Sequence, residues 1–295
     1  MKNIIITGGR GLLASELTHR LLADGNWNIF LVSRSPQDIR PANHLQAIEL
    51  AQLVNDKALR NLSYDALVHT AFSRSLDGED LKKSLDFLTD VLAVAKQLEL
   101  KSFINISSQG VYGTKHNENV SCDETMSLSP GDNYSIAKAF SEVMVNSGFA
   151  NSNINHTNIR LASILSHKES KRFVNILVDH AKHQRDINIS GGNQHFSFID
   201  IDDASQAITT MLNYCDKKWE PVYNLGTGLS HSLLEIAIMV ADIAKREYGY
   251  EISIHVLPAT NDANMKLSVT RFSTDFFWHP QCSLESSIEK LFKNQ

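Results

Sequence analysis

The sequence predicts an α/β protein built on a doubly wound parallel sheet, and three observations support this prediction. A short apolar run at residues 3–7 leads directly into a glycine-rich turn. Strand-like and helix-like patterns then alternate along the first half of the chain, as in right-handed βαβ units. The expected strands are continuous apolar runs, which is typical of strands covered by helices on both faces of a sheet.

The elements of the first half are expected in a regular order. The leucines between residues 12 and 22 recur at helical spacing, and Gly25 ends that helix. Apolar runs predict the remaining strands, and longer amphipathic stretches predict the helices between them. After the first strand, strands are expected at residues 28–33, 46–50, 66–70, 102–107 and 156–161, and helices at 81–98 and from about 134 to 147.

The alternation becomes less regular after about residue 165. Helices are expected at residues 173–183, 202–214 and 232–248, and strands at 187–189 and 221–224. No low-complexity linker separates the two halves. We therefore expect residues 1–165 to form the main domain and residues 166–295 to form a smaller α/β lobe, with some segments returning to the core of the main domain.

Composition excludes several classes of protein. The chain has 295 residues, 42% of them hydrophobic and 21% charged, and a net charge of −5, which argues against a general nucleic-acid binder. No apolar run reaches the roughly 18 residues of a membrane span, and the glycine turn interrupts the N-terminal run too early for a signal peptide. The three cysteines lack zinc or redox spacing. We expect a reduced, cytoplasmic protein without a metal site.

The turn Thr7-Gly8-Gly9-Arg10-Gly11-Leu12-Leu13-Ala14 predicts a dinucleotide site. Glycines allow a tight turn and a close backbone approach to a pyrophosphate, which sits at the N-terminus of the following helix. A surface turn can also be rich in glycine, but the buried strand before this turn and the amphipathic helix after it favour a Rossmann-type site. The expected contacts are Gly8, Gly9, Arg10, Gly11, Leu12 and Leu13.

The end of the second strand indicates which nicotinamide cofactor fits. An NAD site usually has an acidic residue there for the ribose 2′-hydroxyl, whereas this chain has Ser33-Arg34. Arg34 could form charge-assisted bonds with a 2′-phosphate, and Arg10 could reach the same phosphate. Alternatively, both arginines are solvated surface residues, and Asp38 supports NAD through a longer loop. The pattern favours NADP(H) and keeps NAD as an alternative.

Two further motifs follow in order. Ser107-Ser108-Gln109-Gly110-Val111-Tyr112-Gly113 ends the fifth strand, and Tyr134-Ser135-Ile136-Ala137-Lys138 lies on the next helix. Tyr and Lys four residues apart merely share a helix face, but the combination with the glycine turn resembles the extended short-chain dehydrogenase/reductase family. Within it, the chain is similar to the NAD(P)-dependent epimerase/dehydratase, sugar-nucleotide-modifying branch. The resemblance covers nearly the whole chain and implies an NAD(P)-dependent oxidoreductase.

This resemblance implies roles for individual residues. Tyr134 would donate a proton to a carbonyl oxygen that Ser108 orients. Lys138 would favour the phenolate of Tyr134, since a free phenol has a pKa of about 10, and would hold the nicotinamide ribose. The remaining expected cofactor contacts are Ser33, Arg34, Thr70, Ala71, Phe72, Ser107 and Tyr134. The expected substrate contacts are Ser108, Gln109, Tyr112, Tyr134 and His195.

Several of these assignments have a plain structural alternative. Ser107 could bond to backbone at the strand end, and Tyr112 could simply pack in the interior. We expect His69 to be a packed histidine rather than a catalyst. The pair Asp202-Asp203 is expected to cap the following helix and brace the second lobe.

The sequence departs from the family pattern at two places. Dehydratases of the family have Asp-Glu directly after the position of Ser108, whereas this chain has Gln109 and Gly110, which disfavours a 4,6-dehydratase. Many nucleotide-sugar members have an arginine near the position of His195 that binds the substrate diphosphate. If a diphosphate binds here, its charge must be met by Arg160, Lys168, Lys171, Arg172, His195 or Arg271.

The expected function is NADP(H)-dependent reduction of a 4-keto-6-deoxy nucleotide sugar for surface polysaccharide. A nucleotide-sugar 4-epimerase that retains NAD would use the same Ser, Tyr and Lys and is the first alternative. A non-catalytic, dinucleotide-sensing regulator of the same fold is the second. The expected partner is a small molecule, with no nucleic acid or membrane, and a homodimer is one option for the oligomeric state.

Overall fold

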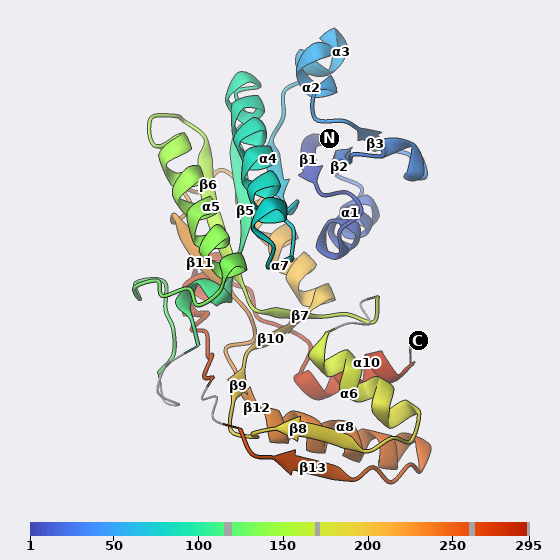
Figure 1. The fold of residues 1–295 in the computed structure, drawn as a ribbon. Helices are drawn as coiled ribbons and strands as arrows, with labels where there is room; N and C mark the ends of the chain where they lie inside the picture. The colour runs from blue at the N-terminus through green and yellow to red at the C-terminus, as the bar shows by residue number, and fades with distance from the viewer. Residues whose placement is uncertain (115–119, 169–171, 260–262, 294–295) are drawn as a thin grey trace. The chain divides into compact units, whose positions relative to one another are not determined.

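The computed structural model describes residues 1–114, 120–168, 172–259 and 263–293 (Figure 1). The chain divides into two compact units. The first comprises Met1–Val111, Ser127–Leu161 and Ser205–Tyr223, and the second comprises Tyr112–Met126, Ala162–Ala204 and Asn224–Gln295. Within the described part of the chain, no helix combines the length and the apolar character that crossing a membrane requires.

A seven-stranded sheet with the order β11-β6-β5-β4-β1-β2-β3 organises the first unit. The pairings from β6 to β3 are all parallel, so the predicted doubly wound α/β fold is confirmed. The order reverses between β1 and β4, and ligands of such sheets bind at the carboxyl ends of the strands at this point. The strands are β1 (Lys2–Thr7), β2 (Trp27–Val32), β3 (Leu45–Ile48), β4 (Ala66–His69), β5 (Ser102–Ser108), β6 (Asn155–Leu161) and β11 (Val222–Leu225).

Helices cover both faces of this sheet. The helices α4 (Gly78–Gln97) and α5 (Asn133–Phe149) lie side by side and pack on a core that includes Ile5 and Phe103. Because successive strand residues point to opposite faces, Ile4 and Ile6 face the other side, where α1 (Leu12–Asp24) packs against β1 and β2. Burial on both faces explains the continuous apolar runs in the sequence.

The predicted elements of the first unit agree with the structure to within a few residues, and the differences have local causes. The helix α4 begins before the predicted residue 81 because Asp77 caps it, accepting bonds from the N–H groups of Glu79 (2.9 Å) and Asp80 (3.1 Å). The short helices α2 (Gln52–Asn55) and α3 (Lys57–Arg60) were not predicted, since one helical turn leaves little periodicity in a sequence.

Among its described residues, the second unit contains three two-stranded sheets, of which the sequence predicted one strand, near residues 187–189. The strand pairs are β7 (Ser163–Leu165) with β10 (Phe198–Asp200), β8 (Ile187–Ser190) with β13 (Ile254–Leu257), and β9 (His195–Phe196) with β12 (His231–Ser232); the helices include α6 (Phe173–Lys182), α8 (Leu233–Tyr248), α9 (Thr270–Phe276) and α10 (Leu284–Lys293). The helices α6, α8 and α10 bury their apolar faces in one core that includes Val178, Val240 and Ile288.

The predicted capping role of Asp202-Asp203 is wrong in detail. The helix α7 (Ile201–Asn213) begins one residue earlier, and the Asp200 carboxylate accepts the N–H of Asp202 at 2.9 Å. Asp203 instead accepts the backbone N–H groups of Gln281 and Cys282. Asp203 therefore braces the segment that leads into α10, and Asp202 accepts Lys290 Nζ of α10 at 2.8 Å. The bracing role is as the sequence predicted, but Asp200 provides the cap.

Candidate active site

The glycine turn between β1 and α1 has no room for side chains. Gly8 has a φ of +78°, and a Cβ there would lie 2.9 Å from Thr70 Oγ1. A Cβ on Gly9 would lie 2.8 Å from Leu31 Cγ, and one on Gly11 would lie 3.0 Å from the carbonyl oxygen of Gly8. A larger residue at any of these three positions would displace its neighbours, so the turn requires glycine there.

The helix that follows this turn is open to an anion at its N-terminus. The N-cap of α1 is Gly11, which offers no side-chain acceptor, and the first turn contains no acidic residue. The helices α4 and α5, by contrast, are capped by Asp77 and Asp132. Because the first N–H groups of a helix lack intrahelical partners and carry partial positive charge, the turn and helix fit the pyrophosphate of a dinucleotide.

The carboxyl ends of β1 and β4 are joined by hydrogen bonds. Thr7 and His69 are paired in register, with Thr7 Oγ1 2.9 Å from His69 Nδ1. Thr70 Oγ1 donates to the carbonyl oxygen of Thr7 at 2.7 Å. His69 is 1% exposed, and burial, aided by the charge of Lys138, lowers its pKa to about 3. His69 is therefore a packed, neutral histidine, as predicted.

The residues expected to distinguish the two cofactors lie at the surface. Arg34 is exposed directly after β2, and Arg10 Nη1 lies 3.6 Å from Asp38 Oδ2. The two side chains of that pair are 70% and 54% exposed, so it contributes little to stability. Ser33 is buried, and its hydroxyl accepts the N–H of Ser35 at 3.2 Å. Arg10, Arg34 and Asp38 thus lie near the end of β2, where the sequence predicts that the two cofactors are distinguished.

Ser108 reaches the start of α5 through a tight turn. It ends β5, and its Oγ accepts the N–H of Gly110 at 3.1 Å. A Cβ on Gly110 would lie 2.5 Å from Ser135 Oγ, so this turn passes directly against the first turn of the helix that carries Tyr134. Asp132 fixes that end of α5 by accepting the N–H of Ser135 at 2.7 Å.

Lys138 lies one helical turn after Tyr134 and is 3% exposed. Its Nζ donates to the carbonyl oxygen of Ile106 at 2.6 Å and lies 3.8 Å from the centroid of the Phe72 ring and 6.0 Å from that of Tyr134. The rings of Phe72 and Tyr134 meet edge to face at 6.1 Å. Burial lowers the pKa of Lys138 to about 7, although the charge of Glu142 opposes this change.

The structure corrects two expectations from the sequence, which concern Ser107 and Arg160 beside α5. Ser107 Oγ donates to the Glu142 carboxylate at 2.5 Å rather than bonding to backbone. Arg160 also pairs with this carboxylate, with Nη2 2.8 Å from Oε2, and the two side chains are 7% and 5% exposed. Because this pair is sealed in the interior, Arg160 is excluded as the diphosphate ligand.

The other candidate substrate residues divide between the units. Gln109 is buried beside Ser108 in the first unit, whereas Tyr112 and His195 belong to the second. Tyr112 is 0% exposed, and its hydroxyl donates to Asn224 Oδ1 at 2.8 Å. We therefore assign Tyr112 to packing rather than to substrate contact.

The candidate diphosphate ligands of the second unit are less constrained. Lys168 is exposed, and Arg172 precedes α6. Arg271 Nε lies 3.7 Å from Glu124 Oε2, and His195 Nδ1 lies 2.8 Å from the carbonyl oxygen of Asn193. Lys171 lies outside the described residues.

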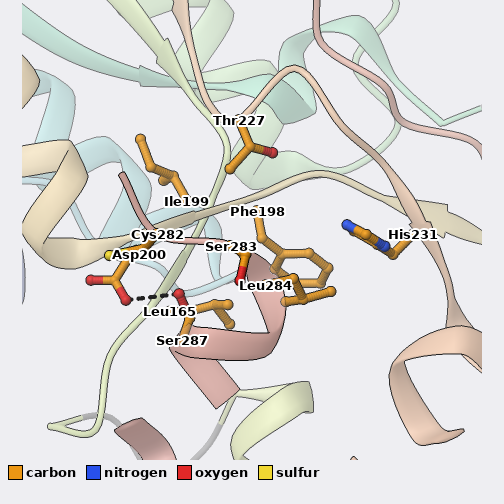
Figure 2. A pocket seen from close by; sticks show the side chains of 10 residues that line it. All are labelled: Leu165, Phe198, Ile199, Asp200, Thr227, His231, Cys282, Ser283, Leu284 and Ser287. Atoms are coloured by element: carbon orange, nitrogen blue, oxygen red, sulfur yellow. Dashed lines mark hydrogen bonds between the residues drawn. The ribbon is translucent and has the colours of Figure 1, made fainter. Parts of the chain in front are cut away.

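A cavity within the second unit does not supply a substrate site. Figure 2 shows its polar side, where Ser287 Oγ donates to the Asp200 carboxylate at 2.8 Å. Its volume of about 10 Å³ is room for roughly one water molecule. The lining residues are Leu165, Phe198, Ile199, Asp200, Thr227, His231, Cys282, Ser283, Leu284 and Ser287.

Sequence comparisons agree with the motifs. The model of the NAD dependent epimerase/dehydratase family matches residues 4–226. A dTDP-D-glucose 4,6-dehydratase of Dictyostelium discoideum is 25% identical over 280 residues, which cover 83% of this chain and 62% of that protein. The human protein of the same name is 24% identical over 267 residues, covering 83% of this chain and 74% of that one. The chain thus spans less than two thirds of the Dictyostelium relative.

Solved structures share the fold at lower identity. The UDP-glucose 4-epimerase of Thermotoga maritima with UDP-glucose is 20% identical and has a TM-score of 0.83, with 99% of this chain and 98% of that chain covered. The UDP-glucuronic acid 4-epimerase of Bacillus cereus with UDP-glucuronic acid and NAD is also 20% identical, with a TM-score of 0.81 and the same coverage. At this identity the likeness is one of fold.

Proposed function

Because the chain belongs to the NAD-dependent epimerase/dehydratase family, we propose that it is an NADP(H)-dependent reductase of a 4-keto-6-deoxy nucleotide sugar. The observation that supports this proposal most strongly is the position of three residues in the first unit. Ser108 ends β5, and Tyr134 and Lys138 lie on α5. A nicotinamide cofactor bound at the glycine turn would supply the hydride. The other steps belong to side chains of this chain.

Each of these side chains has a separate task in the proposed reaction. Tyr134 donates its phenolic proton to the carbonyl oxygen of the substrate. Ser108 Oγ hydrogen-bonds that oxygen and orients it. Lys138 favours the phenolate by its charge and binds the nicotinamide ribose. Lys138 is buried, so its charge lies in a region of low dielectric constant, where electrostatic interactions are stronger than in water.

The turn after Ser108 supports reduction over dehydration. Dehydratases of the family have Asp-Glu directly after the position of Ser108, so a dehydratase would need a carboxylate side chain at position 110. This chain has glycine there. A Cβ at that position would lie 2.5 Å from Ser135 Oγ, so a glutamate could enter only if the Ser135 hydroxyl turned away. We therefore do not transfer the activity of the dehydratase relatives to this chain.

A nucleotide-sugar 4-epimerase is the second candidate. The likeness in fold to UDP-sugar 4-epimerases favours it, and Asp38 beside Arg10 could serve an NAD ribose. The two candidates differ in cofactor turnover, because a reductase consumes NADPH whereas an epimerase regenerates its NAD. NADPH oxidation followed at 340 nm with 4-keto-6-deoxy nucleotide sugars generated in situ distinguishes them. Stoichiometric NAD in the purified protein, with interconversion of C4 epimers, would reject the reductase.

Tyr134→Phe tests the chemistry. The change removes the proposed proton donor and keeps the ring, so turnover should fall about 10²–10⁴-fold with little change in cofactor affinity. Tyr64→Phe is the matched control, since it removes a buried hydroxyl that donates to the carbonyl oxygen of Leu59 at 3.0 Å far from the proposed chemistry. Near-normal turnover of Tyr134→Phe would refute the assignment.

Arg34→Ala tests the cofactor. We expect NADPH to bind at least about tenfold more tightly than NADH, because one charge-assisted bond to a phosphate contributes roughly 1.5–3 kcal/mol. The loss of Arg34 should weaken the binding of NADPH about 10–100-fold. The affinity for NADH should remain nearly unchanged. Arg10→Ala in the same background removes any compensation by the neighbouring arginine. Arg40→Ala, also exposed, is the control, and equal affinity of the wild type for both cofactors would favour the epimerase.

A further inference from the structure

Glu142 is a buried carboxylate one helical turn after Lys138. Its side chain is 5% exposed, and burial of a charge is costly unless partners satisfy it. Three groups do so: Ser107 Oγ donates at 2.5 Å, Arg160 Nε lies 3.0 Å from Oε1, and Arg160 Nη2 lies 2.8 Å from Oε2. Ser107 of β5 and Arg160 of β6 thus hold the carboxylate in place against α5.

The surroundings of Lys138 contain few charges. From β4, His69 approaches it as a neutral imidazole, and β5 presents only the carbonyl oxygen of Ile106. The apolar ring of Phe72 covers the ammonium, and Tyr134 lies on the same helix. Within the described part of the chain, the charged groups that face Lys138 are Glu142 and, behind it, Arg160 of β6.

Lys138 and Glu142 lie four residues apart on α5, and both are buried. Residues four apart on a helix share one face, with about 5–6 Å between their Cβ atoms. Burial lowers the pKa of Lys138 to about 7, and Glu142 acts against that effect. Without the carboxylate, Lys138 would lose its proton at a lower pH.

We propose that the buried pair of Glu142 and Arg160 is a positioning device for the reaction, in which Glu142 keeps Lys138 protonated near neutral pH. Arg160 and Ser107 bind the carboxylate and fix its position. The inference rests on the role that the proposed function gives to Lys138, because only the protonated lysine favours the phenolate of Tyr134. Glu142 therefore acts through Lys138 and touches no reacting atom.

The charge state of Lys138 can be measured without any substrate. Protein labelled with ¹³C at the lysine Cε is titrated by NMR, and Lys138→Arg assigns the resonance. Glu142→Gln keeps the shape of the side chain, removes its charge and leaves Arg160 uncompensated. For opposite charges one turn apart, we expect the pKa of Lys138 to fall by about one to two pH units.

The double variant E142Q/R160M provides a second test in case E142Q alone does not fold. It leaves no uncompensated charge in the interior, and it should also lower the pKa of Lys138, by less than E142Q alone, since the carboxylate is the nearer charge. Asn158→Ala is the matched control. It removes neutral hydrogen bonds to Asn105 and Asn146 in the same layer, so it should lower stability without moving the Lys138 titration.

The activity profile provides a second readout. The limb of the kcat/KM profile that reports free Lys138 should move in the variants by the same amount as the NMR titration. An unchanged Lys138 pKa in E142Q, or in the double variant if E142Q does not fold, would overturn the inference and leave the pair a structural role. A shifted Lys138 pKa in a protein that reduces none of the sugars would support the inference while the proposed function fails.

Discussion

The buried His69 makes a defined prediction about acid stability. Its pKa is about 3 in the folded protein and 6.5 in an ordinary environment. Between these values the unfolded chain binds a proton that the folded chain does not, so folding stability falls as the pH is lowered through this range. One pKa unit corresponds to 1.36 kcal/mol, which gives about 5 kcal/mol in all and about 3 kcal/mol between pH 6.5 and pH 4.

The variant His69→Asn tests this prediction. Asn retains a polar atom near Nδ1, which faces Thr7 Oγ1 at 2.9 Å, but it does not titrate. The variant should lose stability at neutral pH through lost ring packing, yet its free energy of unfolding should decline less steeply with acid than that of the wild type. Urea unfolding followed by circular dichroism at pH 7.5, 6.5, 5.5, 4.5 and 4.0 measures both curves.

A packing control separates titration from destabilisation. The ring of Phe87 lies 6.0 Å from that of His69, and Phe87→Leu should lower stability equally at every pH. The free energy of unfolding of His69→Asn is compared with that of the wild type at pH 6.5 and at pH 4.0. If the difference between the two proteins is the same at both pH values, the assignment of a neutral, buried His69 is refuted.

Two further predictions concern the turn and the lysine. Gly9→Ala should destabilise the protein by about 1–3 kcal/mol and weaken dinucleotide binding, because its Cβ would lie 2.8 Å from Leu31 Cγ. Thermal unfolding and cofactor titration check this, with Gly148→Ala, whose Cβ has ordinary contacts of 3.5 Å or more, expected to be neutral or stabilising. Phe72→Ala should raise the pKa of Lys138, since burial is the main cause of its low value; an unchanged ¹³C titration would contradict this.

Local patterns predicted most of the first unit. Continuous apolar runs located β1, β4 and β5, and helical periodicity located α1 and α5. The four-residue spacing of Tyr134 and Lys138 placed both residues on one face of a helix, and both lie on α5. Glu142 was missed, although its position four residues after Lys138 on a helix that packs in the core was a usable signal, because a charge on a buried face needs a partner.

By itself, the sequence determined the fold class, the succession of the main strands along the chain and the glycine turn, because periodicity and spacing act over a few residues. Only the tertiary structure decided how polar groups are paired across the chain. Arg160 forms an ion pair with Glu142 and does not face a substrate phosphate. The Tyr112 hydroxyl donates to Asn224, which lies 112 residues later in the chain. Such partners are fixed by which buried groups meet when the strands assemble, and no local pattern records that.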